Sequence, residues 1–272
     1  PVRPHPFASV VETVPAERAD VPADLLRAAR GNHIPLLERA LKTYDKLGIR
    51  GYTCRLRKQE RIKGKMKKQQ VVRVAFMEDP YSLAMHWEKN PPLGDALLYV
   101  EGMYTDKKGR SLMLVRPHSG VLKFLTGGSV LKLPDCKEAM KNTLKPCTQF
   151  GFRNGLNLLL KYYRIAEKNG HLKMGCGGAT EVGDRQCIVL VREIPEKSVT
   201  VEINGEPREI EYPAKISETC LDVETLLPLR IVGYDWNNRL FCTYEFLDVE
   251  LNPGLEPKDF TPAAVGINPP KK

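Results

Sequence analysis

Alternation of apolar and polar residues with a period of two constrains this chain more than any other feature of its sequence. From residue 51 onward, short alternating segments follow one another, separated by tight polar turns. This period places apolar side chains on one face of a strand and polar side chains on the other. Six such segments in succession predict an antiparallel meander. They are residues 51–61, 72–76, 81–87, 96–103, 110–116 and 121–126.

Two segments instead repeat apolar residues at three- and four-residue spacing, which predicts amphipathic helices. The first covers residues 34–47, with Asn32 as its N-cap and Gly48 just beyond its end. The second covers residues 151–167 and interrupts the run of strands. Strands then resume, and Asn204-Gly205 predicts a hairpin turn between residues 201–203 and 206–211. The other strands predicted after the second helix are residues 171–181, 185–193, 229–236 and 240–249.

Together these elements predict an α+β fold, in which a large antiparallel sheet carries helices on one side. The 272 residues are 42% hydrophobic and 28% charged, which is typical of a globular protein with a sizeable core. No apolar run approaches the roughly 18 residues that a membrane-spanning helix needs. Residues 1–30 are expected to form an irregular Pro-rich segment in which a helix starts. Residues 31–262 are expected to form a single domain, and residues 263–272 a tail.

The net charge of +9 comes from one short region. Residues 50–73 contain ten Lys or Arg and one acid, so this window carries 10 − 1 = +9 and the rest of the chain balances. Three interpretations remain open: a solvated strand face, a surface that contacts anionic membranes, and a nucleic-acid site. Nucleic acid is the least favoured, because the aromatic Tyr52 and Phe76 fall on the strand face opposite the charges. The predicted anionic-surface patch comprises Arg55, Arg57, Arg61 and Arg73.

Signatures of enzymes and metal sites do not occur in the sequence. The seven cysteines and five histidines show no metal-ligand spacing, and no nucleophile elbow or phosphate-binding loop is present. We therefore expect no catalytic residue, no metal site and no cofactor. Cys176 and Cys187 fall on consecutive predicted strands, and we expect them to lie close enough to form a disulfide if the chain is exported.

Large apolar side chains of one parity form a further candidate site. We expect them to line the concave face of the sheet, with the helices around Leu41 and Leu159 as its cover. Two interpretations stay open from the residues alone: a filled core, and a cavity that takes an apolar ligand. The predicted ligand-binding residues are Met85, Trp87, Tyr99, Phe124, Tyr234 and Tyr244.

The order of several short motifs resembles an exported bacterial family, domain of unknown function 1571. The match spans about residues 33–262. Its opening motifs are Gly51-Tyr52-Thr53-Cys54, Arg57-Lys58-Gln59-Glu60-Arg61 with Gly64, and Leu98-Tyr99-Val100-Glu101-Gly102. The central motif is Phe150-Gly151-Phe152-Arg153-Asn154-Gly155-Leu156. The closing motifs are Leu221-Asp222-Val223-Glu224, Leu227-Pro228-Leu229-Arg230, Tyr234-Asp235, Tyr244-Glu245-Phe246-Leu247-Asp248, Asn252-Pro253-Gly254-Leu255 and Asp259-Phe260.

The closing motifs are also similar to those of outer-membrane lipoprotein carriers of the LolA/LolB type. This resemblance implies a half-barrel antiparallel sheet whose concave face is covered by helices. It also implies export to the periplasm or cell envelope after removal of a signal peptide. The function it suggests is non-enzymatic binding of an apolar ligand, either a lipid acyl chain or a lipidated protein. The alternative is an interaction or scaffold protein of the envelope with a fully packed sheet and a basic surface patch. The sequence does not indicate an oligomeric state.

Overall fold

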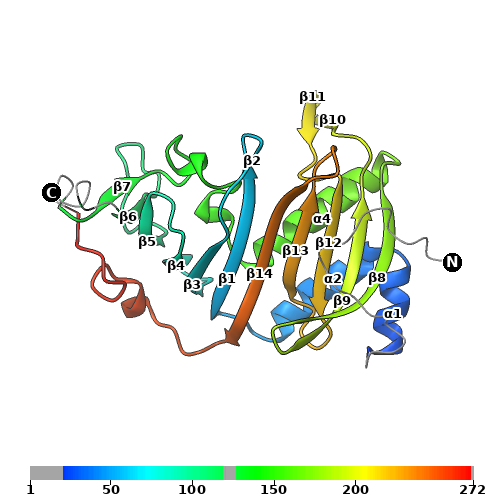
Figure 1. Cartoon of the computed structure of the whole chain (residues 1–272), viewed down its shortest axis with the longest axis horizontal. Helices are drawn as coiled ribbons and strands as arrows, with labels where there is room; N and C mark the ends of the chain where they lie inside the picture. Colours follow the sequence, from blue (N-terminus) through cyan, green and yellow to red (C-terminus); the bar gives the residue numbers. More distant parts are fainter. Residues whose placement is uncertain (1–20, 119, 121–126, 271–272) are drawn as a thin grey trace. The chain divides into compact units, whose positions relative to one another are not determined.

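The computed structural model describes residues 21–118, 120 and 127–270, and these divide into two compact units (Figure 1). Unit 1 combines the chain up to Leu47 with Phe152–Glu245, and unit 2 combines Gly48–Gly151 with the chain from Phe246 onward. The chain therefore leaves unit 1, builds most of unit 2, returns, and ends in unit 2. The strand predicted at residues 121–126, together with Phe124, lies outside the described residues. The prediction of one folding domain over residues 31–262 stays a prediction.

Unit 1 is an antiparallel sheet with helices on one face. Its strand order is β14-β13-β12-β9-β8, every neighbouring pair is antiparallel, and β14 continues into unit 2. The helices are α1 (Ala23–Arg30), α2 (His33–Lys46) and α4 (Phe152–Lys168). The strands are β8 (Lys173–Val182), β9 (Arg185–Glu193), β12 (Ile216–Asp222), β13 (Pro228–Tyr234) and β14 (Leu240–Leu251). A separate hairpin of β10 (Ser198–Ile203) and β11 (Glu206–Glu211) turns at Asn204-Gly205, as predicted.

The helices of unit 1 form because their apolar residues recur on one side and their ends are capped. Asn32 accepts a hydrogen bond from the backbone N–H of Ile34 at 2.8 Å, which confirms it as the N-cap of α2. Gly48 adopts a positive φ of 57°, the backbone conformation expected just after a helix end. The inner sides of the three helices bury one apolar cluster against β9. Its members include Leu25, Leu37, Leu156, Leu160, Ile188 and Leu190.

One strand of unit 1 was absent from the predictions. β12 pairs with β9 on one side and β13 on the other, and all seven of its residues are buried. Because both of its faces are covered, its sequence shows no alternation between apolar and polar residues. Its buried polar residues, such as Glu218 and Asp222, also give it the composition of a loop.

The strands of unit 2 belong to the same 12-stranded sheet and follow the order β7-β6-β5-β4-β3-β1, with the short β2 paired to β1. The strands are β1 (Gly51–Ile62), β2 (Lys65–Met66), β3 (Gln70–Met77), β4 (Ser82–Lys89), β5 (Gly94–Val100), β6 (Met113–Pro117) and β7 (Val130–Lys132). Short 3-10 turns follow at η2 (Ala139–Lys141), η3 (Cys147–Gln149) and η4 (Pro257–Phe260). The predicted meander of sequential antiparallel strands is confirmed from β1 to β6.

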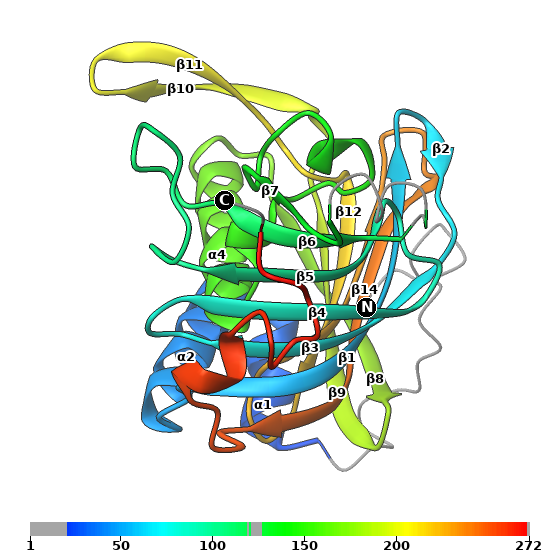
Figure 2. The same ribbon diagram turned by 90° about the vertical axis from the view of Figure 1, so that its left-hand side faces the viewer.

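The two faces of the unit 2 sheet have different covers. One face is crossed by the C-terminal segment, which runs over strands β3 to β6 in Figure 2. Phe260, Val265 and Ile267 of that segment pack there against side chains such as Ala84 and Leu98. The opposite face carries the apolar alternation of β1, β3, β4 and β5.

The structure confirms the α+β class, with antiparallel strands and with α1, α2 and α4 packed on one sheet face. It contradicts the expected disulfide. Cys176 lies opposite Leu190, whereas Cys187 lies opposite Thr180, so the two residues are displaced along the strands by about three residues, or about 10 Å. All seven cysteines are free thiols. Proximity of the two strands was predicted correctly, but the turn at Gly183-Asp184 sets a register in which Val182 pairs with Arg185 and Cys187 with Thr180, away from Cys176.

Candidate ligand-binding face

Three of the predicted ligand-binding residues lie together on one face of unit 2. Met85 on β4 pairs with Val74 of β3 and Leu97 of β5, and Tyr99 pairs with Leu83. Directly paired residues point to the same side of a sheet, so Met85, Trp87 and Tyr99 share a face. We call this surface the apolar face of unit 2. It comprises Tyr52, Cys54, Leu56, Val72, Val74, Phe76, Leu83, Met85, Trp87, Leu97 and Tyr99.

Two other predicted residues belong to unit 1 and do not share a face with each other. Tyr244 pairs with Ile231, whereas Tyr234 pairs with Ile216 and lies at the opposite parity of β13. Tyr244 is therefore on the helix side of its sheet and Tyr234 on the other side. Their binding role stays a prediction, and the geometry groups neither with Met85.

A strap without long regular elements covers the apolar face of unit 2. We define the strap as residues 139–150, which contain only the short turns η2 and η3. At its end, the Phe150 ring packs 5.7 Å from the ring of Phe76 and 6.3 Å from that of Tyr52. The Tyr81 hydroxyl donates to the backbone oxygens of Cys147 and Phe150 at 2.7 and 3.1 Å. Aromatic packing and one shared hydroxyl proton therefore hold this end of the strap.

A buried carboxylate holds the middle of the strap. Glu60 of β1 is 3% exposed, and it accepts a hydrogen bond from the backbone N–H of Leu144 at 3.3 Å. Lys58 donates to the same carboxylate at 3.2 Å and to the Thr143 hydroxyl at 3.3 Å. Nearby on the same sheet face, the Trp87 indole N–H donates to Gln70 at 2.7 Å. The apolar face therefore ends in a polar cluster in which the described charges are paired.

The two thiols and the Tyr81 phenol at this face stay protonated at neutral pH. Burial raises the pKa of the Cys147 thiol to about 12 and moves that of Cys54 far above its usual range. Burial likewise raises the pKa of the Tyr81 phenol. A thiol needs a lowered pKa to act as a nucleophile, so these cysteines behave as small apolar groups. The surface suits apolar contact and offers no activated nucleophile.

The predicted basic patch is partly neutralised by acids from neighbouring strands. Arg55 and Arg73 pair across β1 and β3, and both bind Glu88 of β4 at 2.8 and 3.2 Å. Arg55 also approaches Asp248 at 3.9 Å. Arg61 donates to the backbone oxygen of Gly64 in the adjoining turn at 3.1 Å. Arg57 has the same parity in β1 as Arg55 and Arg61, so the register places all four on one face.

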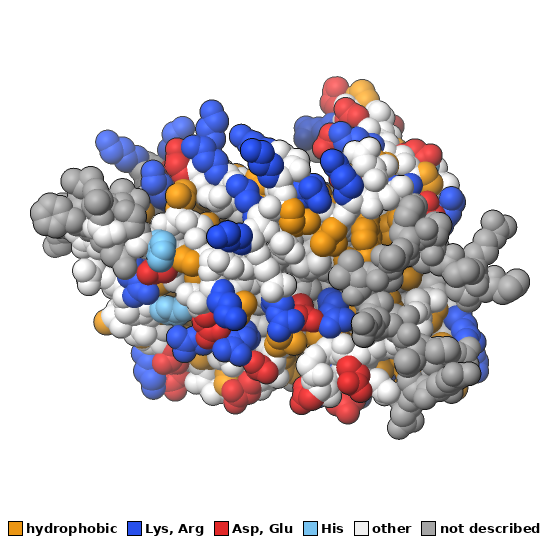
Figure 3. Space-filling model, viewed as in Figure 1, with side chains coloured by type: hydrophobic (Ala, Val, Ile, Leu, Met, Phe, Trp, Pro, Cys, Tyr) orange, Lys and Arg blue, Asp and Glu red, His pale blue; other side chains and the backbone are white. Residues whose placement is uncertain are grey.

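Figure 3 shows where positive charge remains. Lys and Arg side chains gather around the β1–β2 turn, whereas acidic side chains are interspersed among the basic ones lower on the same face. The lysines near this turn are Lys63, Lys65, Lys67 and Lys68, and no ion pair involves them within the described residues. Whether the patch binds an anionic surface stays a prediction.

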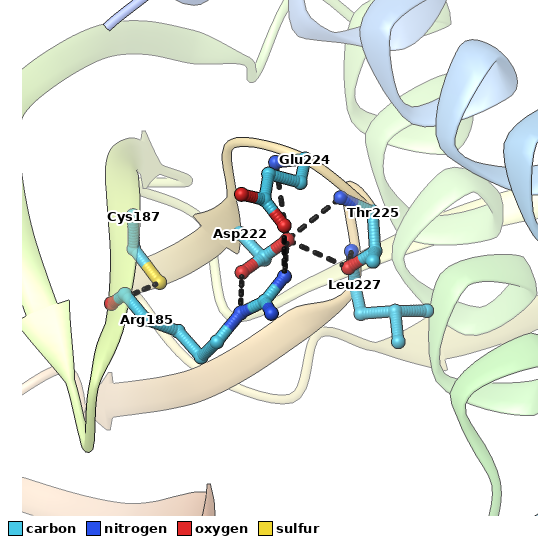
Figure 4. A network of polar contacts seen from close by, with 6 residues as sticks. All are labelled: Arg185, Cys187, Asp222, Glu224, Thr225 and Leu227. Atoms are coloured by element: carbon cyan, nitrogen blue, oxygen red, sulfur yellow. Dashed lines mark hydrogen bonds and ion pairs between the residues drawn. The ribbon is translucent and has the colours of Figure 1, made fainter. Parts of the chain in front are cut away.

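A buried polar network in unit 1 is a site that the sequence interpretation missed. Asp222, at the end of β12, is 1% exposed, and its carboxylate accepts two hydrogen bonds from Arg185 at 2.7 and 3.0 Å (Figure 4). It also accepts from the backbone N–H groups of Glu224 and Thr225 and from the Thr225 hydroxyl. Burial alone would raise the pKa of Asp222, but these donors outweigh it and hold the pKa below its usual value.

The geometry of this network indicates a structural corner. The donors fix the turn that links β12 to β13, and both carboxylate oxygens of Asp222 accept hydrogen bonds from within the chain. Asp222 belongs to the closing motif that resembles the family, so the motif marks a fold determinant. The available signal was an Asp followed three residues later by Thr at a strand end.

Other motif residues also have packing roles. A Cβ atom at Gly51 would lie 2.6 Å from the backbone oxygen of Phe76, which is closer than side chains can approach. Gly151 has a φ of 114°, and the Phe76 ring lies against it. Asn252 donates through its side chain to Gly48 and accepts from the backbone of Arg50. These motif positions thus have packing roles, and none of them locates a catalytic group.

The geometry of unit 2 is thus that of an antiparallel sheet with one extended apolar face under an irregular strap. The sequence matches the family described as "Protein of unknown function (DUF1571)" over residues 49–268, and the chain belongs to that family. This confirms the resemblance inferred from the motifs. The search of curated proteins finds no match.

Several solved structures are similar in chain path. The chain of the Pseudomonas aeruginosa MucA/MucB complex aligns with 9% identity and a TM-score of 0.46, over 88% of this chain and 63% of that one. A DUF1329 family protein from Desulfovibrio piger aligns with 12% identity and a TM-score of 0.38, over 86% and 100%. A LolA superfamily protein from Nitrosomonas europaea aligns with 9% identity and a TM-score of 0.30, over 83% and 97%. This chain therefore spans less than two thirds of the MucA/MucB chain, and likenesses at these TM-scores assign no function.

Two further findings concern the described residues only. Within residues 21–118, 120 and 127–270, no group of three or more His, Cys, Asp or Glu side chains is placed to hold a metal ion. In the same part of the chain, no helix is long and apolar enough to cross a membrane.

Proposed function

We propose that this chain is a non-enzymatic cell-envelope protein that binds an apolar ligand on the apolar face of unit 2. The ligand is a lipid acyl chain or the acyl group of a lipidated protein. The observation that carries the proposal is the combination of a continuous apolar sheet face with an irregular strap over it. Location in the periplasm or envelope is supported by the resemblance of the closing motifs to those of exported carriers.

The strap supports this proposal because its attachments are few and local. Its middle is held through Glu60 and its end through Tyr81 and Phe150. An acyl chain that replaced the strap would contact Met85, Trp87 and Tyr99, whose side chains offer apolar area without a buried charge. Burial of ten methylene groups at roughly 0.8 kcal/mol each contributes about 8 kcal/mol, which corresponds to micromolar affinity before ordering costs. Micromolar affinity allows a carrier to release its cargo.

The decisive variant is Met85→Asp. Met85 is 9% exposed on the apolar face, so an aspartate there places a charge where the acyl chain would lie. We expect the variant to keep its cooperative thermal transition and to bind one molecule fewer of a fluorescent fatty acid, cis-parinaric acid, than the wild type does. The matched control is His86→Asp, one residue along β4 and on the opposite face beside Arg73. The control should bind cis-parinaric acid as the wild type does.

The alternative function, a scaffold with a fully packed sheet, predicts a different result. In that case Met85→Asp would abolish the thermal transition, because the charge would have no space and no counter-charge. Native mass spectrometry of the protein purified from its own membrane fraction provides an independent measurement. Co-purified lipid supports the carrier. Its absence, together with loss of the Met85→Asp transition, would establish the scaffold.

A further inference from the structure

The core of unit 1 contains an arginine without a counter-charge. Arg192 of β9 has the same parity as Ile188 and Leu190, so it points toward the helices, and it is 1% exposed. Its Nη2 donates to the backbone oxygen of Ala214 at 3.4 Å, a long contact. Its Nε has no hydrogen-bond partner among the described residues. This guanidinium therefore retains donor capacity inside the protein.

The groups around Arg192 are aromatic and neutral. Its Cζ lies 5.5 Å from the ring centroid of Tyr163, a cation–π contact. The other side chains that act on it electrostatically are Tyr162, Tyr212 and Cys242. Burial lowers the pKa of Arg192, and the tyrosines oppose that shift, yet a guanidinium remains protonated in proteins. Within the described residues no carboxylate forms an ion pair with it.

A neighbouring histidine fixes the aromatic wall of this site. The His33 Nε2 faces the backbone oxygen of Ala29 at 2.9 Å, and a carbonyl can only accept, so this nitrogen carries the proton. The His33 Nδ1 therefore accepts from the Tyr163 hydroxyl at 3.4 Å. The hydroxyl of Tyr163 is thereby engaged by His33, while its ring lies against the guanidinium of Arg192. His33 is a positioning residue for this wall.

The apolar packing of unit 1 is interrupted at the level of Arg192. One cluster includes Leu160, Tyr163 and Leu190 on one side of it. A second cluster includes Ala166 and Tyr212 on the other side, where the chain leaves β9. Across the sheet, the register row of Arg192 continues through the small residues Ser217, Gly233 and Cys242. A positive charge thus lies between two apolar clusters. In its row, Met174 is the neighbour on the β8 side, and only small residues follow on the β12 side.

We propose that Arg192 binds the head group of a monoanionic amphiphile, whose apolar part packs on the adjoining clusters of unit 1. One guanidinium balances one negative charge, so a carboxylate or a phosphodiester fits better than a dianion in these apolar surroundings. Tyr162, which interacts with Arg192, is only half-buried, so the site has one neighbour that is in contact with solvent. This site is separate from the apolar face of unit 2 and does not depend on the function proposed there.

The test compares a charged and a neutral ligand of the same length. Binding of decanoate and decanol to the full chain is measured by calorimetry for the wild type, Arg192→Met and the control Arg164→Met. Arg164 lies on the exposed side of α4 and pairs with Glu38. We expect the wild type and the control to prefer decanoate over decanol by roughly tenfold or more, the value of charged hydrogen bonds. Arg192→Met should abolish that preference, and it should fold, because it removes a buried charge without a partner.

Three outcomes would overturn the inference. They are no preference for decanoate in the wild type, the same preference in Arg192→Met, and binding of inorganic phosphate alone in place of decanoate. The last outcome would indicate a simple anion site. If Arg192→Met does not fold, an NMR titration of carboxyl-labelled decanoate bound to the wild type takes the place of the variant experiment. A bound carboxylate that stays ionised below its solution pKa in an NMR titration supports the site, and an unshifted titration overturns it.

The outcome is distinguishable from failure of the proposed function. Met85→Asp tests the apolar face of unit 2 through total fatty-acid binding, whereas Arg192→Met tests the preference for a charged head group. Suppose that Arg192→Met loses the preference for decanoate, while Met85→Asp binds as much fatty acid as the wild type does. The unit 1 site would then be established, and the site on the apolar face of unit 2 would not.

Discussion

The two units cover their antiparallel sheets with different kinds of structure. In unit 1 the cover is helical, and α1, α2 and α4 bury one apolar cluster against β9. In unit 2 the strap and the C-terminal segment cover the two faces, and both consist mainly of irregular chain. A helix satisfies its own backbone groups, whereas an irregular segment needs partners from elsewhere. The strap finds these partners in the side chains of Tyr81 and Glu60.

This difference indicates which cover can move. Separation of a helix from the unit 1 sheet would expose a whole apolar cluster at once. Release of the strap would break the side-chain hydrogen bonds of Glu60 and Tyr81 and the contacts of one aromatic ring, that of Phe150. We therefore expect the strap of unit 2 to open more readily than the helical cover of unit 1, and the following four predictions test this expectation.

The largest effect is expected in unit 1, at the corner after β12. Asp222→Ala removes the acceptor of Arg185 and of the turn donors, and it should destabilise the protein by about 3 kcal/mol, as is typical for a broken buried pair. Urea unfolding measures this loss. The control Glu224→Ala removes the exposed partner of the same arginine, so it should cost less than about 1 kcal/mol. Equal losses in the two variants would show that the corner does not depend on Asp222.

The second effect is a pH dependence that arises from His33. Burial lowers the pKa of this imidazole to about 4, and the unfolded value is 6.5. Above pH 6.5 both states are neutral and stability is unaffected. As the pH falls from 6.5 to 4, only the unfolded state gains a proton, so the folded state loses up to about 3 kcal/mol.

Thermal melts across this pH range should show the effect. His33→Gln should reduce the fall in melting temperature between pH 6.5 and 4. The further loss of stability at lower pH, which arises from protonation of carboxylates, should remain. A variant curve parallel to that of the wild type throughout would mean that His33 is not held neutral.

The third effect is local to the strap. Tyr81→Phe removes the hydroxyl that donates to Cys147 and Phe150, and it should cost about 1 kcal/mol. Hydrogen exchange of residues 139–150 should accelerate, and exchange in α2 and α4 should not change. Tyr162→Phe is the matched control in unit 1. Faster exchange in the helices upon Tyr81→Phe would contradict the assignment of mobility to the strap alone.

The smallest effect concerns the basic patch. Arg55 and Arg73 share Glu88 as a counter-charge, so the pair Arg55→Gln and Arg73→Gln should weaken binding to vesicles with anionic lipid only slightly. The pair Lys63→Gln and Lys65→Gln should weaken it more and should flatten its salt dependence. Fold stability should change by only a few tenths of a kcal/mol in both pairs. If neither pair alters co-sedimentation with the vesicles, the patch is only a solvated face.

Local sequence patterns determined much of this fold. The two-residue period identified β1 to β6 and assigned Met85, Trp87 and Tyr99 to one face, because parity along a strand survives in any antiparallel pairing. The cap at Asn32 and the turn at Asn204-Gly205 followed from backbone chemistry that acts within a few residues. The ordered motifs identified the family.

Only the tertiary structure decided what covers each face. β12 was hidden because strands buried on both sides lose their alternation, and the pairing of Arg55 and Arg73 with Glu88 joins three strands. The parity of β9 turned Arg192 inward, but nothing in its sequence neighbourhood showed that no acid would meet it there. Periodicity reports the side to which a residue points. The groups that meet it come from distant segments of the chain, and their positions are fixed only by packing.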